Sequence, residues 1–342
     1  MRFLTKDEMA RWVSKLASDR LVVAPKAMGE LVLFQPVRQA EEVAWGYRLS
    51  VLSPKEWLFP ATEVLFTLEE RDGAPQLTPA ATEQETVLFA LRPCDAQGIA
   101  LLDLPFMASP ADSLYAGRRA KTALVGMACR QPGRAGFCPS LGGGPSDATH
   151  VDLMLREVEE GYLVEVVTEK GRGLLSGVST QEWEGDVLSS SKGEVLAPSA
   201  VASVPTQGLV EAMPALFNAP YWERLADRCL HCNICAYVCP TCYCFDVKDY
   251  PGRGKMERVR CWDSCQAPGF TRIAGGYTPR PTKATRLRQR FYHKLLYFSQ
   301  RFVSLQCTGC GRCVASCPVN IDIREIMADL QQLKENSLAS VA

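Results

Sequence analysis

Histidine is scarce in this sequence: His150, His231 and His293 are the only three, and no two have the spacing of paired metal ligands. The formal net charge is zero, so nothing in the composition points to nucleic acid as a partner. No stretch approaches twenty uninterrupted apolar residues, and the N-terminus MRFLTKDEMARW lacks the apolar core of a signal peptide. We therefore expect a cytoplasmic protein without a membrane span.

Nucleotide-binding and catalytic patterns are also missing. No Gly-x-Gly-x-x-Gly follows an expected strand, and Gly142–Gly144 does not continue into Gly-Lys-Ser/Thr. We also find no acid–base or nucleophile constellation. The chain is therefore expected to perform no substrate chemistry by itself.

Cysteine, by contrast, is abundant. The 342 residues include 15 cysteines, three before residue 229 and twelve from there on. Structural disulfides are rare in a reducing cytoplasm, so this density indicates metal ligation. The uneven placement indicates two domains, a mixed α/β domain at 1–205 and a mainly helical, loop-rich, ferredoxin-like domain at 206–342. The Ser- and Pro-rich stretch 190–209 is the expected linker.

Short periodic segments predict the elements of both domains. In the first, the apolar runs Thr86–Leu91 and Thr122–Met127 predict buried strands, and 152–158 with 162–168 predict a hairpin. A helix is expected directly after Asp95, which would cap it. Helices are expected in the second domain at 215–229, 284–302 and 321–333.

Two cysteine runs of the same spacing lie in the second domain. Both read Cys-x2-Cys-x2-Cys-x3-Cys-Pro, the run that holds [4Fe–4S] clusters in bacterial two-cluster ferredoxins. Three thiolates on one tight loop point at one cluster, while the fourth cysteine ligates the other. Cluster 1 is therefore assigned Cys229, Cys232, Cys235 and Cys317. Cluster 2 is assigned Cys307, Cys310, Cys313 and Cys239.

Two other interpretations of these cysteines remain. Zinc sites use Cys-x2-Cys pairs, which would make this a zinc-stabilised interaction module, but a triplet followed by Cys-Pro, given twice, favours iron–sulfur. Cys235-x3-Cys239-x2-Cys242 also has the triplet spacing of radical enzymes that cleave S-adenosylmethionine. It overlaps the ferredoxin run, and no series of βα repeats surrounds it.

The insert between the runs, at about 245–300, is basic. From Arg253 to Lys294 it holds eleven Lys and Arg against two acidic residues. The charge belongs either to a solvated helix face or to a surface that docks a partner or compensates anionic clusters and raises their potentials. Four further cysteines are either ligands of another cluster or zinc ion, or packing groups near cluster 2: Cys242, Cys244, Cys261 and Cys265.

Several longer stretches carry a family resemblance. They are CPTCYCFD, RCWDSC and the spaced runs, and in the first domain SPKEWLFPATEVLF, LRPCDAQGIALLD and FCPSLGGGP followed by DLMLREVEEGYLVEV. Together they cover nearly the whole chain, which resembles the iron–sulfur A subunit of anaerobic sulfite reductases and equally the β subunit of soluble [NiFe] sulfhydrogenases. The resemblance implies an electron relay between a flavin subunit that oxidises NAD(P)H and a catalytic subunit with sirohaem or nickel–iron. Of the two, a sulfite- or sulfur-reducing complex is favoured.

The three early cysteines, Cys94, Cys129 and Cys138, suggest a third cluster. Cys94 and Cys129 follow the two expected strands, and ligands gather at the ends of neighbouring strands in α/β sheets. The resembled family commonly has Cys-Phe-Cys where this chain has Gly136-Phe137-Cys138, so one candidate ligand is missing. Asp95, a thiolate of the insert, or an exposed iron would complete the site. The alternatives are three ordinary buried thiols, or an enzyme that binds substrate at that exposed iron.

Overall fold

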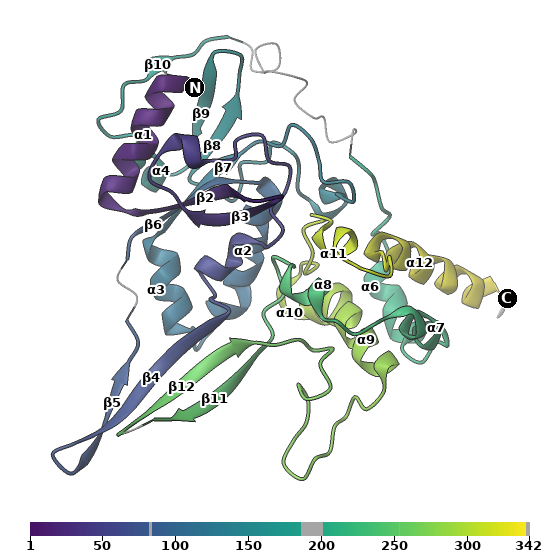
Figure 1. The fold of residues 1–342 in the computed structure, drawn as a ribbon. Helices are drawn as coiled ribbons and strands as arrows, with labels where there is room; N and C mark the ends of the chain where they lie inside the picture. Colours follow the sequence, from purple (N-terminus) through teal and green to yellow (C-terminus); the bar gives the residue numbers. More distant parts are fainter. Residues whose placement is uncertain (82–83, 186–200, 253, 340–342) are drawn as a thin grey trace. The chain divides into compact units, whose positions relative to one another are not determined.

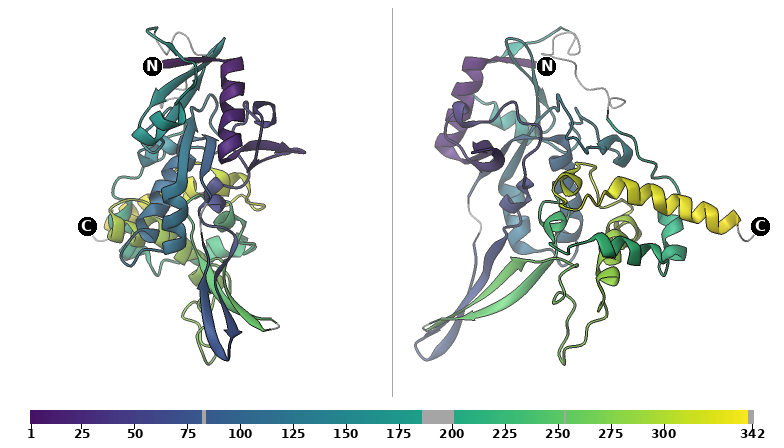
Figure 2. Two further views of the ribbon diagram at one scale, coloured as in Figure 1. Left: turned by 90° about the vertical axis from the view of Figure 1, so that its left-hand side faces the viewer. Right: turned by 45° about the vertical axis from the view of Figure 1, so that its right-hand side comes forward.

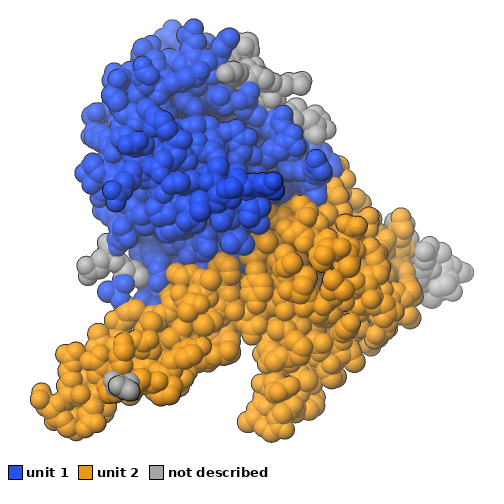
Figure 3. Space-filling model, viewed as in Figure 1, with its two compact units in different colours: residues 1–59, 81–202, 308–310 blue, residues 60–80, 203–307, 311–342 orange. Residues whose placement is uncertain are grey.

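The structure is a computed structural model that describes residues 1–81, 84–185, 201–252 and 254–339, with side chains up to 334. Residues 190–200 of the expected linker lie outside the described residues. The chain divides into two compact units, coloured separately in Figure 3. Unit 1 contains residues 1–59, 81–202 and 308–310, and unit 2 contains residues 60–80, 203–307 and 311–342.

Unit 1 is built on an eight-stranded mixed sheet of order β10-β1-β9-β8-β7-β6-β2-β3 (Figure 1). Strands β2, β6, β7 and β8 run parallel, and the remaining pairs are antiparallel. The strands are β1 Arg2–Thr5, β2 Leu21–Met28, β3 Leu31–Pro36, β6 Thr86–Leu91, β7 Thr122–Met127, β8 Leu153–Glu157, β9 Gly161–Val166 and β10 Gln181–Glu182. The helices are α1 Lys6–Asp19, α2 Pro93–Phe106, α3 Ser113–Lys121 and α4 Glu169–Leu174, with 3-10 turns at Ala40–Glu42, Pro54–Trp57 and Cys138–Leu141.

Helices cover both faces of this sheet. One face packs on α1 and α4 through a core that includes Trp12, Phe89 and Val125, whereas α2 and α3 lie on the other face. Helix α1 starts with a capping box, in which Thr5 Oγ1 accepts from the Glu8 amide and Glu8 accepts from the Thr5 amide. Buried on both faces, the central strands read as continuous apolar runs, which is why sequence alone found them.

The strand expectations for unit 1 are confirmed. Thr86–Leu91 is β6, Thr122–Met127 is β7, and β8 with β9 forms the antiparallel hairpin. The expected cap of α2 is wrong: the helix starts at Pro93, and the cap position is Arg92. Proline with its fixed φ is favoured at the first helical position, so the helix begins before Asp95 and places this side chain in its first turn.

Gly161 lets β9 approach β1 closely. A Cβ built at Gly161 would lie 2.1 Å from the Leu4 carbonyl oxygen. We expect Gly161→Ala to destabilise unit 1 by about 1–3 kcal/mol, because backbone in a paired strand has to shift. In Gly173→Ala, on α4, the new Cβ meets nothing within 4 Å, and we expect a gain of about 0.4–1 kcal/mol. Urea unfolding of both variants tests this, and equal effects would contradict it.

Unit 2 combines a four-stranded antiparallel sheet, order β11-β12-β4-β5, with short helices. The sheet is a long twisted ribbon of two hairpins (Figure 2). The strands are β4 Thr62–Arg71, β5 Ala74–Pro79, β11 Phe245–Pro251 and β12 Lys255–Trp262. The helices are α6 Leu209–Ala212, α7 Tyr221–Arg228, α8 Ile234–Tyr237, α9 Lys283–Tyr292, α10 Phe298–Phe302, α11 Arg312–Ala315 and α12 Ile323–Ala339, with a 3-10 turn at Met213–Leu216 and a π-helical turn at His293–Tyr297.

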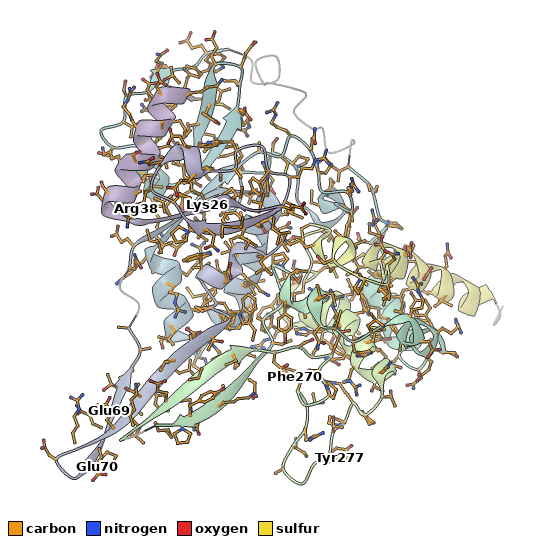
Figure 4. All side chains as sticks on the ribbon, viewed as in Figure 1. Lys26, Arg38, Glu69, Glu70, Phe270 and Tyr277 are labelled. Atoms are coloured by element: carbon orange, nitrogen blue, oxygen red, sulfur yellow. The ribbon has the colours of Figure 1, made fainter. Side chains whose placement is uncertain are left out.

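This sheet was not expected in the second domain, and the expectation of a mainly helical domain is not confirmed. The first part of the basic insert is the β11–β12 hairpin, and β12 pairs with β4, a strand from residues that the sequence placed in the first domain. Beyond β12, a long loop carries Phe270 and Tyr277 at the positions labelled in Figure 4. The pairing joins segments far apart in the chain, which local periodicity does not predict.

Candidate metal centres

The two cysteine runs share an uncommon backbone. In the first run, His231 and Asn233 have φ of 53° and 63°, and in the second, Gly309 and Gly311 have φ of 64° and 77°. These residues occupy the same two positions between the three cysteines of each run. Left-handed backbone there curls the loop, and a short helix, α8 or α11, begins directly after it. The first run keeps this shape although neither residue is glycine.

The four cysteines assigned to cluster 1 line one cavity of unit 2. Its wall is completed by apolar side chains such as Leu287, Phe291 and Ile323. The cysteines come from two segments far apart in the chain: Cys229, Cys232 and Cys235 from the loop before and the start of α8, and Cys317 from the residues after α11. The structure therefore brings together the set that crossed ligation requires, and Cys313, which is assigned to cluster 2, lines the same cavity.

Hydrogen-bond donors point at three of these sulfurs. The His231 amide donates to Cys229 Sγ at 3.4 Å, Gln266 Nε2 to Cys235 Sγ at 3.2 Å, and the Ile321 amide to Cys317 Sγ at 3.2 Å. Burial and then the neighbouring thiolates raise the pKa of Cys229, and the His231 amide opposes this. Donors of this kind stabilise negative charge on sulfur and tune the potential of an iron–sulfur cluster.

The same cavity passes a test of fit for an iron–sulfur cluster. Arg290 lines it with a buried side chain, and its Nε has no hydrogen-bond partner among the described residues. A buried donor needs an acceptor, which the sulfides of an anionic cluster would supply. Across the described part of the chain, no three His, Cys, Asp or Glu are arranged around a single metal ion. Bonds of about 2.3 Å would bring zinc thiolates within about 4 Å of one another, whereas a cluster spreads its ligands more widely.

The residues assigned to cluster 2 are divided between the units. Cys239, Cys307 and Cys313 belong to unit 2, and Cys310 belongs to the segment 308–310 of unit 1. Cys239 is 7% exposed, and its sulfur accepts a hydrogen bond from Lys294 Nζ at 3.2 Å. Burial acts to lower the pKa of Lys294, but the charges of Cys239 and other thiolates outweigh it and raise that pKa. The ammonium group therefore remains charged beside the sulfur.

The early cysteines gather at the carboxyl ends of β6 and β7. Arg92, two residues before Cys94, donates to the Ala128 carbonyl, the residue before Cys129. Gln97, one turn further along α2, donates to the Leu141 carbonyl at the end of the 3-10 turn that starts at Cys138. Burial and the neighbouring Cys129 raise the pKa of Cys138 to about 11.

The segment 308–310 packs against the loop of Cys138 within unit 1. The Phe137 amide donates to the Gly309 carbonyl at 2.7 Å. A Cβ on Gly309 would lie 2.6 Å from the Cys138 amide nitrogen, so only glycine allows this approach. Cys310 is close enough to contribute to the raised pKa of Cys138.

The insert cysteines follow two patterns. Cys242 hydrogen-bonds Cys239, and Cys265 hydrogen-bonds Cys244; these contacts, with burial, raise the pKa values of Cys242 and Cys265. Cys261 instead lies on β12, paired with Asp246 and Thr62. Cys242 therefore lies beside Cys239, which is assigned to cluster 2, whereas Cys244 and Cys265 form a separate pair and Cys261 is part of the sheet.

The basic charge of the insert is in part buried. Arg286, Arg290 and Lys294 recur every four residues along α9 and the π-helical turn, and they are 8%, 3% and 2% exposed. A solvated helix face does not describe these three residues, and Arg258, another cation of the insert, lies on a strand of the β11–β12 hairpin, where it pairs with Asp249. Sequence reasoning found the charge excess but not the buried stripe, whose four-residue spacing was the available signal.

These cysteine-lined centres are those of an iron–sulfur protein. Residues 228–321 match the 4Fe-4S dicluster domain family. The chain is 30% identical over 318 residues to "Sulfhydrogenase 2 subunit beta" of Pyrococcus furiosus, covering 91% of this chain and 92% of that relative. The chain belongs to this family of sulfhydrogenase β subunits, so the resemblance seen in the sequence is confirmed.

Two negative findings complete the comparison. No solved structure matches the chain. None of the helices in the described residues is both long enough and apolar enough to span a membrane.

Proposed function

We propose that the chain is the electron-transfer subunit of a multi-subunit oxidoreductase and performs no substrate chemistry by itself. The observation that supports this most directly is the cavity lined by Cys229, Cys232, Cys235 and Cys317, together with the match to the 4Fe-4S dicluster domain family. Bound clusters would supply one-electron transfer. The chain's own residues would hold the clusters, shield them from water with apolar side chains, and donate N–H groups to the ligand sulfurs.

The proposed cofactors are two [4Fe–4S] clusters with the crossed ligation assigned above, and a third in unit 1. The third is supported by the convergence of Cys94, Cys129 and Cys138 at one end of the sheet. Since Gly136 replaces a family cysteine, its fourth ligand is a different group, and the buried Asp95 in the first turn of α2 is the candidate. Cys242 is proposed as a neighbouring thiol of cluster 2, and Cys244 with Cys265 as a separate hydrogen-bonded pair.

The proposed partners are a flavin subunit that oxidises NAD(P)H and a catalytic redox subunit. The relative is a sulfhydrogenase subunit, which favours a nickel–iron catalytic subunit and lends no support to the initial preference for sulfite reductase. The identity of the catalytic subunit encoded beside this chain tests the choice. A sirohaem protein there would reverse it.

Metal analysis of the chain purified without oxygen tests the relay proposal. We expect about eight irons and eight labile sulfides per chain for two clusters, and about twelve of each for three. We also expect reduction by dithionite to produce EPR signals of reduced clusters, and no hydrogen- or NADPH-dependent turnover in the absence of partner subunits. A colourless protein that contains zinc would establish the interaction module instead. Turnover by the chain alone, or a spectrum that changes with substrate, would establish an enzyme.

A further inference from the structure

Lys294 and Arg286, two buried cations of unit 2, make different contacts. Arg286 is satisfied by backbone carbonyls, those of Gln266, Arg280 and Pro281. Lys294 contacts a sulfur: its ammonium group donates hydrogen bonds to Cys239, Thr241 and Gln306, none of which is a carboxylate. A buried charge is costly unless it is compensated, and here the compensating group is a predicted cluster ligand.

The position of the Lys294 ammonium group is fixed by three contacts. Its Nζ lies 3.2 Å from Cys239 Sγ, 2.9 Å from Thr241 Oγ1 and 2.9 Å from the Gln306 carbonyl oxygen. An ammonium group has three N–H donors, and all three are used. Thr241 also donates to the Gln306 carbonyl, and Gln306 Nε2 donates back to the Thr241 carbonyl. The network joins the end of the first cysteine run to the residue before the second.

The helix that carries Lys294 is irregular at this point. α9 ends at Tyr292, and Lys294 is the second residue of the π-helical turn His293–Tyr297. Such turns are rare and are frequent at functional sites, where they redirect side chains. Arg290, one turn earlier, contacts a different residue of the first run: its Nη2 donates to the Cys235 carbonyl at 3.1 Å. The two cations therefore make their direct contacts with different parts of the first cysteine run.

We propose that Lys294 is a positioning residue that raises the reduction potential of the cluster ligated by Cys239, and so makes that cluster the preferred electron acceptor of the pair. This rests on the relay proposed above. Reduction adds one electron to a cluster, and a fixed positive charge on a ligand sulfur stabilises the more negative, reduced form. The contact is made to Cys239 and not to Cys229, Cys232 or Cys317, so the effect is specific to one cluster.

An EPR-monitored redox titration of the full chain, purified without oxygen, tests the proposal. In Lys294→Met, which removes the charge and keeps the length, we expect the reduction potential of one cluster to fall by at least 59 mV. For a one-electron couple this is a tenfold change in the equilibrium constant for reduction. The reduction potential of the other cluster should stay unchanged. Lys294→Arg should keep the original potential. Arg288→Met is the matched control, because Arg288 is on the same helix but contacts the Phe217 carbonyl and ring.

The affected cluster is identified with Cys239→Ser, which should alter the same EPR signal that shifts in Lys294→Met. Unchanged potentials with full iron content, or an equal shift of both clusters, would overturn the proposal. If Lys294→Met loses iron, Lys294→Gln provides the titration, since its amide can still donate to Thr241 and Gln306. Loss of iron in both variants would show that Lys294 is needed to hold the cluster, and this result would also overturn the proposal. Absence of clusters from the unaltered chain would refute the relay itself, which is a separate result.

Discussion

Cys317→Ala is expected to lower the iron content by about four per chain, the content of one cluster. The lost cluster should be the one whose other ligands belong to the first cysteine run. Cys229→Ala should therefore leave the same residual EPR spectrum as Cys317→Ala. Cys313→Ala and Cys239→Ala should both leave a second residual EPR spectrum, different from the first. The reason is the cavity in which Cys317 meets the first run.

Cys261→Ala is the control for cysteine substitution. Cys261 lies on β12, paired with Asp246 and Thr62, and is not among the residues that line the cavity. Its replacement should leave iron, sulfide and EPR spectrum unchanged. If Cys317→Ala instead shared its residual spectrum with Cys313→Ala, each run would hold its own cluster. Crossed ligation would then be excluded.

Glu63→Gln is expected to destabilise unit 2 by about 3–5 kcal/mol, because it leaves a buried guanidinium without its counter-ion. The Arg260 and Glu63 side chains are 2% and 5% exposed, and Arg260 Nε donates to Glu63 Oε1 at 2.8 Å. The two residues are direct cross-strand partners on β12 and β4. Urea unfolding followed by far-UV circular dichroism and by cluster absorbance measures the change.

Glu69→Gln, at the position on β4 labelled in Figure 4, is the matched control. Glu69 pairs with Arg71, whose side chain is 62% exposed, so we expect a change of at most about 1 kcal/mol. Replacing both Glu63 and Arg260 with Met should recover most of the lost stability, since an apolar pair has no desolvation cost. A Glu63→Gln effect no larger than that of Glu69→Gln would show that this pair does not stabilise the sheet.

Some elements of the fold were predictable because they depend on local pattern. β6 and β7 are continuous apolar runs buried on both faces, and the β8–β9 hairpin alternates around a short turn. The start of α2 was misplaced because Pro93 opens the helix before the acidic residue that resembled a cap. The β4–β12 pairing was missed because exposed strands with charged side chains give a weak signal, and their partner lies far along the chain.

The candidate site was likewise predictable from the sequence only in part. The spacing Cys-x2-Cys-x2-Cys-x3-Cys-Pro predicts the ligand sets, because a loop that surrounds one cluster is a local structure, and the structure places the four cysteines of the first set around one cavity. The spacing did not indicate that His231 and Asn233 take the left-handed backbone that glycines take in the second run. Nor did it indicate which of the eleven basic residues of the insert become buried.

The sequence by itself determined the cofactor class and the family, since both depend on residue types at short, fixed separations. Only the tertiary structure decided that residues 60–80 join the second unit and that Lys294 contacts Cys239. These are contacts between segments distant in the chain. Their free energies come from burial and charge in the packed state, which no local pattern contains.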